Sequence, residues 1–397
     1  MSRKAILIIM SCVIAFGVCS PVYAQPKAKI IALSISYYGF NYALKDDGTV
    51  WTWDKGKATQ IKGLKNIVKV VAGWSHTIAL DMNGDVWTFG MNDVSQLGNR
   101  NVTPTSDIQK PDLKDIVDVG IGFKTSYALG KDGRVWVWGA NVLANNLPLE
   151  VPVTIPGVTN VKAVAGGDKI IMLKKDGTIS MYPGNSTGAS FIQDGKPVYK
   201  QDGVLVESNF DYSYFLFNTF IDFASVDQVK KLQKITKIWS DGSTYYAYRS
   251  NGQIWRFTSY HQEPRVAEDE TQMIDTYNPK IKEISSKTDD LTVYLYYDGT
   301  VKTSALSNEH TYFPSDGPYK GKEYRTYVLG IGRVNTPLDL NHKKRYVVKG
   351  LKNIVDVASN LDGGYALDSS GNVWGWGDRV IANWKSQDVP AILPFFK

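Results

Sequence analysis

A hairpin unit that recurs seven times is the feature that most constrains this chain. Its clearest copy lies in residues 64–90, LKNIVKVVAGWSHTIALDMNGDVWTFG, where two runs typical of β-strands flank the turn dipeptide Asn83-Gly84. If these two residues form the loop, both with positive φ, Leu80 lies opposite Trp87. A third apolar run precedes the hairpin, so the unit is predicted to hold at least three short strands.

The turn glycine marks the period of the repeat. It occurs at Gly48, Gly84, Gly133, Gly177, Gly252, Gly299 and Gly371. A tryptophan follows three residues later in five copies, and a leucine or tyrosine precedes the glycine by four residues in all seven. The preceding apolar runs are predicted to be strands at residues 30–35, 67–72, 116–120, 161–165, 235–239, 281–284 and 354–358. Segments such as residues 58–61 and 151–155 are candidates for a fourth strand.

Four short antiparallel strands repeated seven times predict an all-β fold, a seven-bladed β-propeller. The sequence contains no long amphipathic pattern typical of a helix, which argues against α/β folds. Aromatic residues at alternate positions of the hairpin, such as Trp136 and Trp138, are predicted to pack between blades. The alternative interpretation is a platform of rings that stack on carbohydrate.

The first residues are predicted to be a secretory signal peptide. Arg3 and Lys4 form a basic start, residues 5–18 are apolar, and a small-residue cleavage pattern ends at Ala24. Cleavage there leaves residues 25–397 as one propeller domain with about 53 residues per repeat. The apolar run is short for a membrane span, so we expect no transmembrane segment after cleavage. We expect the mature chain to be secreted by a bacterial cell or held in its envelope.

Composition argues against several classes of function. Both cysteines, Cys12 and Cys19, lie in the signal peptide, so the mature chain is predicted to have no disulfide bond. A net charge of +6, of which the signal peptide holds two units, is too small an excess to indicate nucleic acid. The four histidines have no metal-binding spacing, and no nucleophile elbow or P-loop occurs. We predict a non-enzymatic chain without cofactor or metal. A propeller lyase or hydrolase with catalytic residues scattered over several blades stays open as an alternative.

Two insertions interrupt the period, at about residues 184–224 and 303–346. The first contains a hairpin pattern around Asp202-Gly203 and the aromatic run 210–223, and the second contains a polar, basic and aromatic stretch. Loops on a rigid scaffold commonly carry recognition. The candidate partner-binding residues are therefore Phe210, Tyr212, Tyr214, Phe215, Phe217, Tyr319, Lys322, Tyr324, Arg325 and Tyr327. The other interpretations are a buried aromatic run and a solvated charged loop.

Residues 68–99 closely resemble a repeat of the regulator-of-chromosome-condensation family. The matching features are the pair Gly73 and His76, the Asn-Gly turn, a V-W-x-F-G strand and the tail from Asn92 to Gly98. The other copies match in part. The resemblance implies a seven-bladed propeller used for protein–protein contacts. The founding member of the family exchanges nucleotide on a nuclear GTPase, which an exported protein does not meet, so we do not expect that activity here.

A secreted protein, β-lactamase inhibitor protein II, looks like the same propeller type with shorter repeats. The favoured hypothesis is an exported, monomeric, non-enzymatic propeller that binds another macromolecule, with a protein as the expected partner. The alternatives are an inhibitor of a secreted or periplasmic enzyme and a module that binds cell-wall polymer or glycan. Nucleic acid is not expected as a partner.

Overall fold

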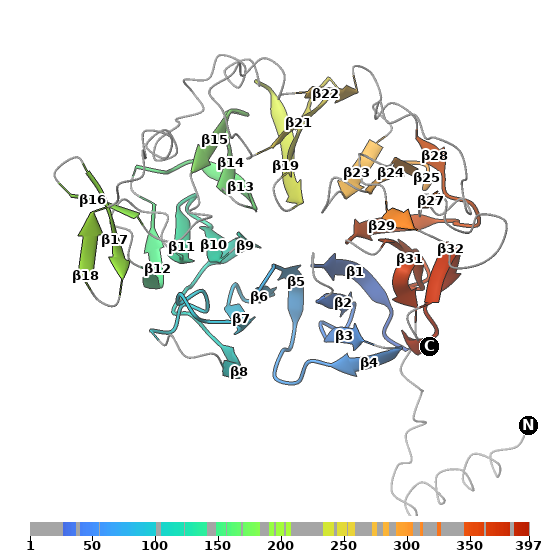
Figure 1. Cartoon of the computed structure of the whole chain (residues 1–397), viewed down its shortest axis with the longest axis horizontal. Helices are drawn as coiled ribbons and strands as arrows, with labels where there is room; N and C mark the ends of the chain where they lie inside the picture. Colours follow the sequence, from blue (N-terminus) through green and yellow to red (C-terminus); the bar gives the residue numbers. More distant parts are fainter. Residues whose placement is uncertain are drawn as a thin grey trace, which may run out of the picture.

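Seven antiparallel sheets stand in a ring and form the blades of a β-propeller (Figure 1). This is a computed structural model, and it describes residues 27–36, 40–54, 56–100, 105–122, 124–140, 148–155, 157–167, 170–182, 190–193, 196–201, 204–207, 233–241, 244–251, 253–258, 272–275, 281–285, 291–304, 310–312, 324–326, 345–360, 363–381 and 385–396. The all-β, seven-bladed fold expected from the repeat is confirmed. None of the helical structure in these ranges has the length and hydrophobicity of a membrane span.

Each blade begins with its innermost strand and runs outward in sequence order. The innermost strands are β1 (Ile30–Ile35), β5 (Ile67–Ala72), β9 (Ile116–Ile121), β13 (Val161–Gly166), β19 (Ile235–Asp241), β23 (Ile281–Ser285) and β29 (Ile354–Ser359). The second strands are β2 (Asn41–Lys45), β6 (His76–Asp81), β10 (Thr125–Gly130), β14 (Ile170–Lys174), β20 (Thr244–Arg249), β24 (Thr292–Tyr296) and β30 (Gly363–Asp368). The predicted inner strands are confirmed to within two residues.

The outer half of each blade holds the third and fourth strands. The third strands are β3 (Val50–Asp54), β7 (Val86–Gly90), β11 (Val135–Gly139), β15 (Ile179–Tyr182), β21 (Ile254–Thr258), β25 (Val301–Ser304) and β31 (Val373–Ile381). The fourth strands are β4 (Lys57–Gln60), β8 (Thr105–Gln109), β12 (Leu149–Thr154), β22 (Gln272–Asp275), β28 (Tyr346–Val347) and β32 (Lys385–Ile392). Blades 1 to 7 take their numbers from the order of the inner strands, and blade 4 has three strands within the described residues.

The two insertions contain small sheets of their own. The first holds β16 (Ser190–Gln193), β17 (Lys196–Gln201) and β18 (Val204–Glu207), and the second holds β26 (His310–Tyr312) and β27 (Tyr324–Thr326). Gln201 pairs with Val204, so the predicted hairpin around Asp202-Gly203 is confirmed. Both insertions follow a third strand. They therefore leave the ring at the same rim, opposite the rim that carries the Asx-Gly turns.

The Asx-Gly turn has one loop residue more than the sequence pattern predicted. In the second copy the Asp81 N–H donates to Asp85 O at 3.0 Å, and the Gly84 N–H donates to Asp81 O at 3.1 Å. Only Gly84 has positive φ, at 82°, as in a type I turn followed by a bulge. The register therefore shifts by one residue, and Trp87 lies opposite Ala79 rather than Leu80. The other four tryptophans at this position also face an alanine.

The turn glycine also locks each blade to the next one. The Ile67 N–H donates to Gly48 O across the first blade boundary at 3.0 Å. A Cβ added to Gly48 would lie 2.7 Å from Asn66 Cα, closer than any real contact of that kind. The recurring glycine is thus required both by its positive φ and by the close approach of the next blade. We call the side of the ring that carries these turns the turn rim.

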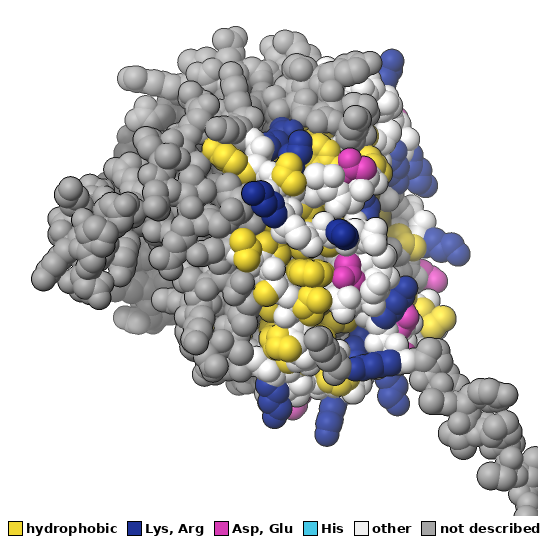
Figure 2. All heavy atoms as spheres, turned by 90° about the vertical axis from the view of Figure 1, so that its right-hand side faces the viewer, with side chains coloured by type: hydrophobic (Ala, Val, Ile, Leu, Met, Phe, Trp, Pro, Cys, Tyr) yellow, Lys and Arg dark blue, Asp and Glu magenta, His cyan; other side chains and the backbone are white. Residues whose placement is uncertain are grey.

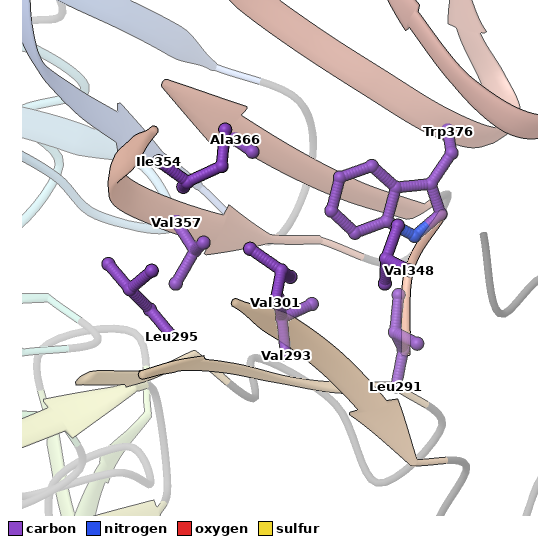
Figure 3. Close-up of a cluster of buried hydrophobic side chains, with 9 residues drawn as sticks. All are labelled: Leu291, Val293, Leu295, Val301, Val348, Ile354, Val357, Ala366 and Trp376. Atoms are coloured by element: carbon purple, nitrogen blue, oxygen red, sulfur yellow. The ribbon is translucent and has the colours of Figure 1, made fainter. Parts of the chain in front are cut away.

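The hydrophobic core is divided into seven clusters, each at the interface between two neighbouring blades. Figure 3 shows the cluster between blades 6 and 7, where Trp376 and Val357 of blade 7 face Leu291, Val293 and Val301 of blade 6. Each blade therefore contributes to two clusters, one on each of its faces. This arrangement explains why the whole ring is needed to complete the core.

The ends of the described chain meet and close the ring. Blade 1 comes entirely from the N-terminal strands and blade 7 entirely from the C-terminal strands, so side-chain packing joins them. The 3₁₀ turn η1 (Pro394–Phe396) places Phe396 against Trp53, with ring centroids 5.1 Å apart. The Leu33 N–H of blade 1 also donates to Asp356 Oδ2 of blade 7 at 2.9 Å.

The tryptophans at alternate positions of the third strands, such as Trp136 and Trp138, lie at blade interfaces, but the two positions differ in burial. Trp53, Trp138 and Trp376, on one set of positions, are buried. Trp136 is only half-buried, and Arg134 stacks on its ring with 5.9 Å between the guanidinium carbon and the ring centroid. The prediction that these rings pack between blades is confirmed for the buried set, to which Trp138 belongs and Trp136 does not.

Candidate functional site at the centre of the ring

The inner strands surround a cavity of about 260 Å³ at the centre of the ring. Its lining comes from blades 1, 2, 6 and 7 and includes Ala32, Val68, Lys69, Glu283 and Asp356. The inner edge of each blade has no further strand to pair with, because the inner strand ends the sheet. Polar side chains can satisfy backbone groups at such an edge.

Charged side chains occupy the third position of five inner strands, at Lys69, Asp118, Lys237, Glu283 and Asp356. Lys69 Nζ lies 2.5 Å from Asp118 Oδ1 and forms an ion pair between blades 2 and 3. Asp356 instead accepts the backbone N–H of Leu33. Lys69, Asp118 and Asp356 therefore connect neighbouring blades at their inner strands.

Burial raises the pKa of Asp356 above its ordinary value. The N–H donors of Leu33 and Val357 and the cations Lys282 and Lys237 act in the opposite direction and favour the ionised form. The carboxylate is thus held by hydrogen bonds to the backbone rather than exposed as a free acid. This carboxylate therefore links blade 7 to blade 1, where the ring closes.

The second residue of the inner strand is exposed on the turn rim, next to the central cavity. In all seven blades the register of the first two strands shifts after the first inner residue, as in a β-bulge. The first residue, such as Ile67, points into the core, and the second, such as Val68, is left in solvent. The bulge therefore places one side chain per blade at the turn-rim end of the inner strand, and among these Val68 lines the cavity.

These side chains divide the mouth into two arcs. The apolar arc consists of Val355 in blade 7, Ile31 in blade 1, Val68 in blade 2 and Val117 in blade 3, with exposed fractions of 37%, 45%, 54% and 53%. The same position holds Lys162 in blade 4, Thr236 in blade 5 and Lys282 in blade 6. Together with Lys234 and Lys237 of blade 5, the two lysines form the basic arc. Each arc is continuous because its blades are neighbours in the ring.

Hydrophobic side chains also reach the surface at the outer edge of the ring. Figure 2 shows such side chains there, interspersed with lysines and arginines. Val347 of β28 and Val389 of β32 are examples, with exposed fractions of 51% and 44%. Isolated exposed apolar residues are common on protein surfaces. The mouth differs because its apolar residues occupy one equivalent position in four consecutive blades.

The histidine of the repeat motif is part of a buried network rather than a site. Ser126 Oγ donates to Gln96 O at 2.9 Å, so it accepts from His76 Nε2, which lies 2.8 Å away. Trp138 Nε1 donates to the same carbonyl at 3.0 Å. Burial lowers the pKa of His76 to about 3, so the imidazole is neutral at ordinary pH. These motif residues join blades 2 and 3.

The partner-binding residues expected from the sequence cannot be placed as a site. Tyr324 and Arg325 lie side by side in the backbone of β27, which pairs with β26. The other eight lie outside the described residues, namely Phe210, Tyr212, Tyr214, Phe215, Phe217, Tyr319, Lys322 and Tyr327. In the described ranges, no group of three His, Cys, Asp or Glu side chains is arranged to hold a metal ion.

The residues of the apolar arc were missed because Ile67-Val68 and its equivalents occur within continuous apolar runs. Such runs are typical of buried strands. The sequence feature that could have indicated an exposed second residue was the residue before each run. Asn66, Asp115 and Asn353 adopt positive φ of 54° to 56°, and Asn and Asp tolerate this conformation best among residues with side chains. A recurring Asx before a strand therefore marks an irregular strand entry.

The sheet order and the seven blades define a seven-bladed β-propeller, and two of its blades match a known repeat. The family model for the regulator of chromosome condensation (RCC1) repeat matches residues 67–96 and 116–143, which form parts of blades 2 and 3. The resemblance stated from the sequence is confirmed.

Known proteins with related sequence or structure support this assignment. The E3 ubiquitin-protein ligase HERC2 of Homo sapiens is 36% identical over an alignment that covers 16% of this chain, and the Mus musculus protein matches equally. The alignment spans only 2% of the length of these relatives. Yeast RCC1 (Prp20) bound to Kap60 superposes with a TM-score of 0.59 at 16% identity, over 95% of this chain and 89% of the yeast chain. Human WBSCR16 superposes with a TM-score of 0.53 at 17% identity, over 85% and 86% of the two chains. These likenesses concern the fold.

Proposed function

We propose that this chain is an exported, non-enzymatic propeller that binds a protein partner at the turn rim. The observation that carries the proposal is the apolar arc, in which four consecutive blades expose a β-branched side chain at one strand position. Exposed apolar patches of this kind mark interaction surfaces. The ring holds the arc rigidly, so little conformational entropy is lost when a partner binds.

The structural neighbours support a protein as the partner. Yeast RCC1 (Prp20) has been solved bound to Kap60. Another structure of Prp20p from Saccharomyces cerevisiae was described together with its binding properties to Gsp1p and histones. These are properties of the yeast protein. They support protein binding as the kind of function to test for the present chain.

Export is supported by the basic start, apolar run and small-residue cleavage pattern of residues 1–24. An exported propeller meets secreted or envelope proteins, including the secreted enzymes that an inhibitor would target. The two insertions leave the ring at the rim opposite the turn rim. Their aromatic residues remain predicted as a second contact surface, for the same partner or another one.

The test is site-specific photo-crosslinking in a native culture. A photoreactive phenylalanine analogue replaces Val68 in the apolar arc or Val389 at the outer edge, and the full chain is recovered with whatever it has captured. We expect one defined protein adduct from Val68 and none from Val389. Equal capture at the two positions, or no protein adduct at Val68, would refute binding at the turn rim.

A further inference from the structure

We infer that the turn-rim mouth binds an acidic amphipathic segment of the partner protein, with apolar side chains on one side and carboxylates on the other. The inference rests on the proposed function and adds the chemistry of the segment. It follows from the division of the mouth into an apolar arc over blades 7, 1, 2 and 3 and a basic arc over blades 4, 5 and 6.

The apolar arc determines one side of the segment. Ile31, Val68 and Val117 are about half exposed, although they follow directly after buried core residues of the same strands. The bulge holds them in this position, so they cannot turn inward without breaking the register that all seven blades share. Covering them with apolar side chains of a partner removes this surface from water.

The basic arc determines the other side. Lys162, Lys234 and Lys237 are exposed. Lys237 Nζ lies 5.1 Å from the centroid of the Trp239 ring, and Lys282 Nζ donates to Val355 O at 2.5 Å. The contact with Val355 holds the Lys282 ammonium group beside the apolar arc, where a carboxylate of a segment lying across the mouth would meet it.

The carboxylates near the basic arc are already engaged. Asp118 pairs with Lys69, and Asp356 accepts the Leu33 N–H. On the neighbouring turns, Asp176 accepts from both the backbone and the hydroxyl of Thr178, and Asp298 accepts from the Thr300 N–H. Glu283 lines the cavity wall at the same strand position as Lys237 of the neighbouring blade. The basic arc presents four lysine ammonium groups to an incoming segment, beside carboxylates that already accept hydrogen bonds from the chain.

The recessed shape of the mouth favours a protein segment over a membrane surface. The cavity of about 260 Å³ begins beside Val68 and has an apolar wall of Leu33, Leu44 and Val70 in addition to its charged groups. One apolar side chain of a segment can enter this space as an anchor. A flat lipid surface would contact the rim and leave the cavity unfilled.

The experiment uses designed probes and the full chain without its signal peptide. The probe is a fluorescent helical peptide of about four turns with leucines on one face and glutamates on the other. A matched peptide carries glutamine in place of every glutamate, and phosphatidylglycerol vesicles represent the membrane. Fluorescence anisotropy and vesicle co-sedimentation measure binding at low and high salt.

We expect the acidic peptide to bind about tenfold more tightly than the glutamine peptide, with a preference that falls as salt rises. Lys162→Glu together with Lys234→Glu should remove that preference, and Val68→Asp together with Val117→Asp should abolish binding of both peptides. Lys57→Glu is the matched control, because Lys57 is an exposed lysine that begins β4 at the opposite rim. Circular dichroism checks that each variant is folded.

The outcomes separate this inference from the proposed function. Equal binding of the two peptides, or a preference that survives the lysine reversals, would overturn the acidic segment even if Val68 still crosslinks to a protein. Binding to vesicles through the same residues, without peptide binding, would identify a lipid surface and overturn it as well. A Val68 position that captures no protein would refute the proposed function itself.

Discussion

Replacing Trp138 by alanine tests the conclusion that the propeller is held together at its blade interfaces. The indole is fully buried between blades 2 and 3, and its Nε1 donates to Gln96 O at 3.0 Å. Truncation of a buried aromatic residue to alanine costs about 3–5 kcal/mol. The Gln96 carbonyl keeps its second donor, Ser126 Oγ, so the lost hydrogen bond adds about 1 kcal/mol or less. We expect a loss of about 4 kcal/mol.

The matched control lies two residues away on the same strand. Trp136 is half-buried and faces Ala128, so Trp136→Ala should cost only about 1–2 kcal/mol. Trp138→Phe retains most of the apolar volume and should cost about 1–2 kcal/mol. Urea unfolding followed by circular dichroism measures all three variants. Equal losses of unfolding free energy for Trp136→Ala and Trp138→Ala would contradict the conclusion that the ring buried between blades stabilises the propeller.

Three further predictions follow from the structure and one from the sequence. Gly84→Ala should lower stability by more than Gly157→Ala in thermal unfolding, because a Cβ at Gly84 meets backbone of the next blade at 3.0 Å whereas Gly157 has open space and a similar positive φ. Burial acts to raise the pKa of Asp368, but hydrogen bonds from Trp374 and Asn372 outweigh it, so the pKa is lowered in the folded chain. The ionised carboxylate therefore stabilises the fold above the ordinary pKa of 3.8, and this contribution is lost as pH falls through the folded pKa. Asp368→Asn should therefore cost about 1–2 kcal/mol at pH 7, with a difference that shrinks in acid-unfolding curves below about pH 4. Removal of residues 393–397 should lower the melting temperature markedly, because it deletes the aromatic contact with blade 1, and an unchanged melting curve would contradict closure through that contact. Mass spectrometry of the exported protein should find a chain that begins at residue 25, and an intact first methionine would contradict this.

The number of blades could be predicted from the sequence because each blade repeats one local pattern. The turn glycine is required by backbone conformation, and the alternating apolar residues are required by burial on both faces of a blade. Both requirements act within a few residues of the chain. The inner strands and the hairpin in the first insertion were predicted correctly for this reason.

The register of the hairpin could not be predicted from Asn83-Gly84 alone. The same dipeptide fits a two-residue turn and a longer turn with a bulge, and the choice exchanges the faces on which Leu80 and Trp87 lie. In the structure the carbonyl of the turn glycine must reach the next inner strand, as Gly48 O reaches Ile67 N. That contact exists only once two blades pack together.

Which side chains are exposed at the mouth of the cavity was likewise determined by the tertiary structure. A run such as Ile67-Val68 predicts burial of both residues, because nothing local to the run distinguishes them. The bulge after Ile67 follows from fitting the start of the inner strand against the turn of the preceding blade, and it leaves Val68 exposed. Closing the ring then brings four such residues and four lysines to the inner strands of one ring, although they are spread from Ile31 to Val355. The sequence determined the repeating unit because its causes are local, whereas the site arises from contacts between units.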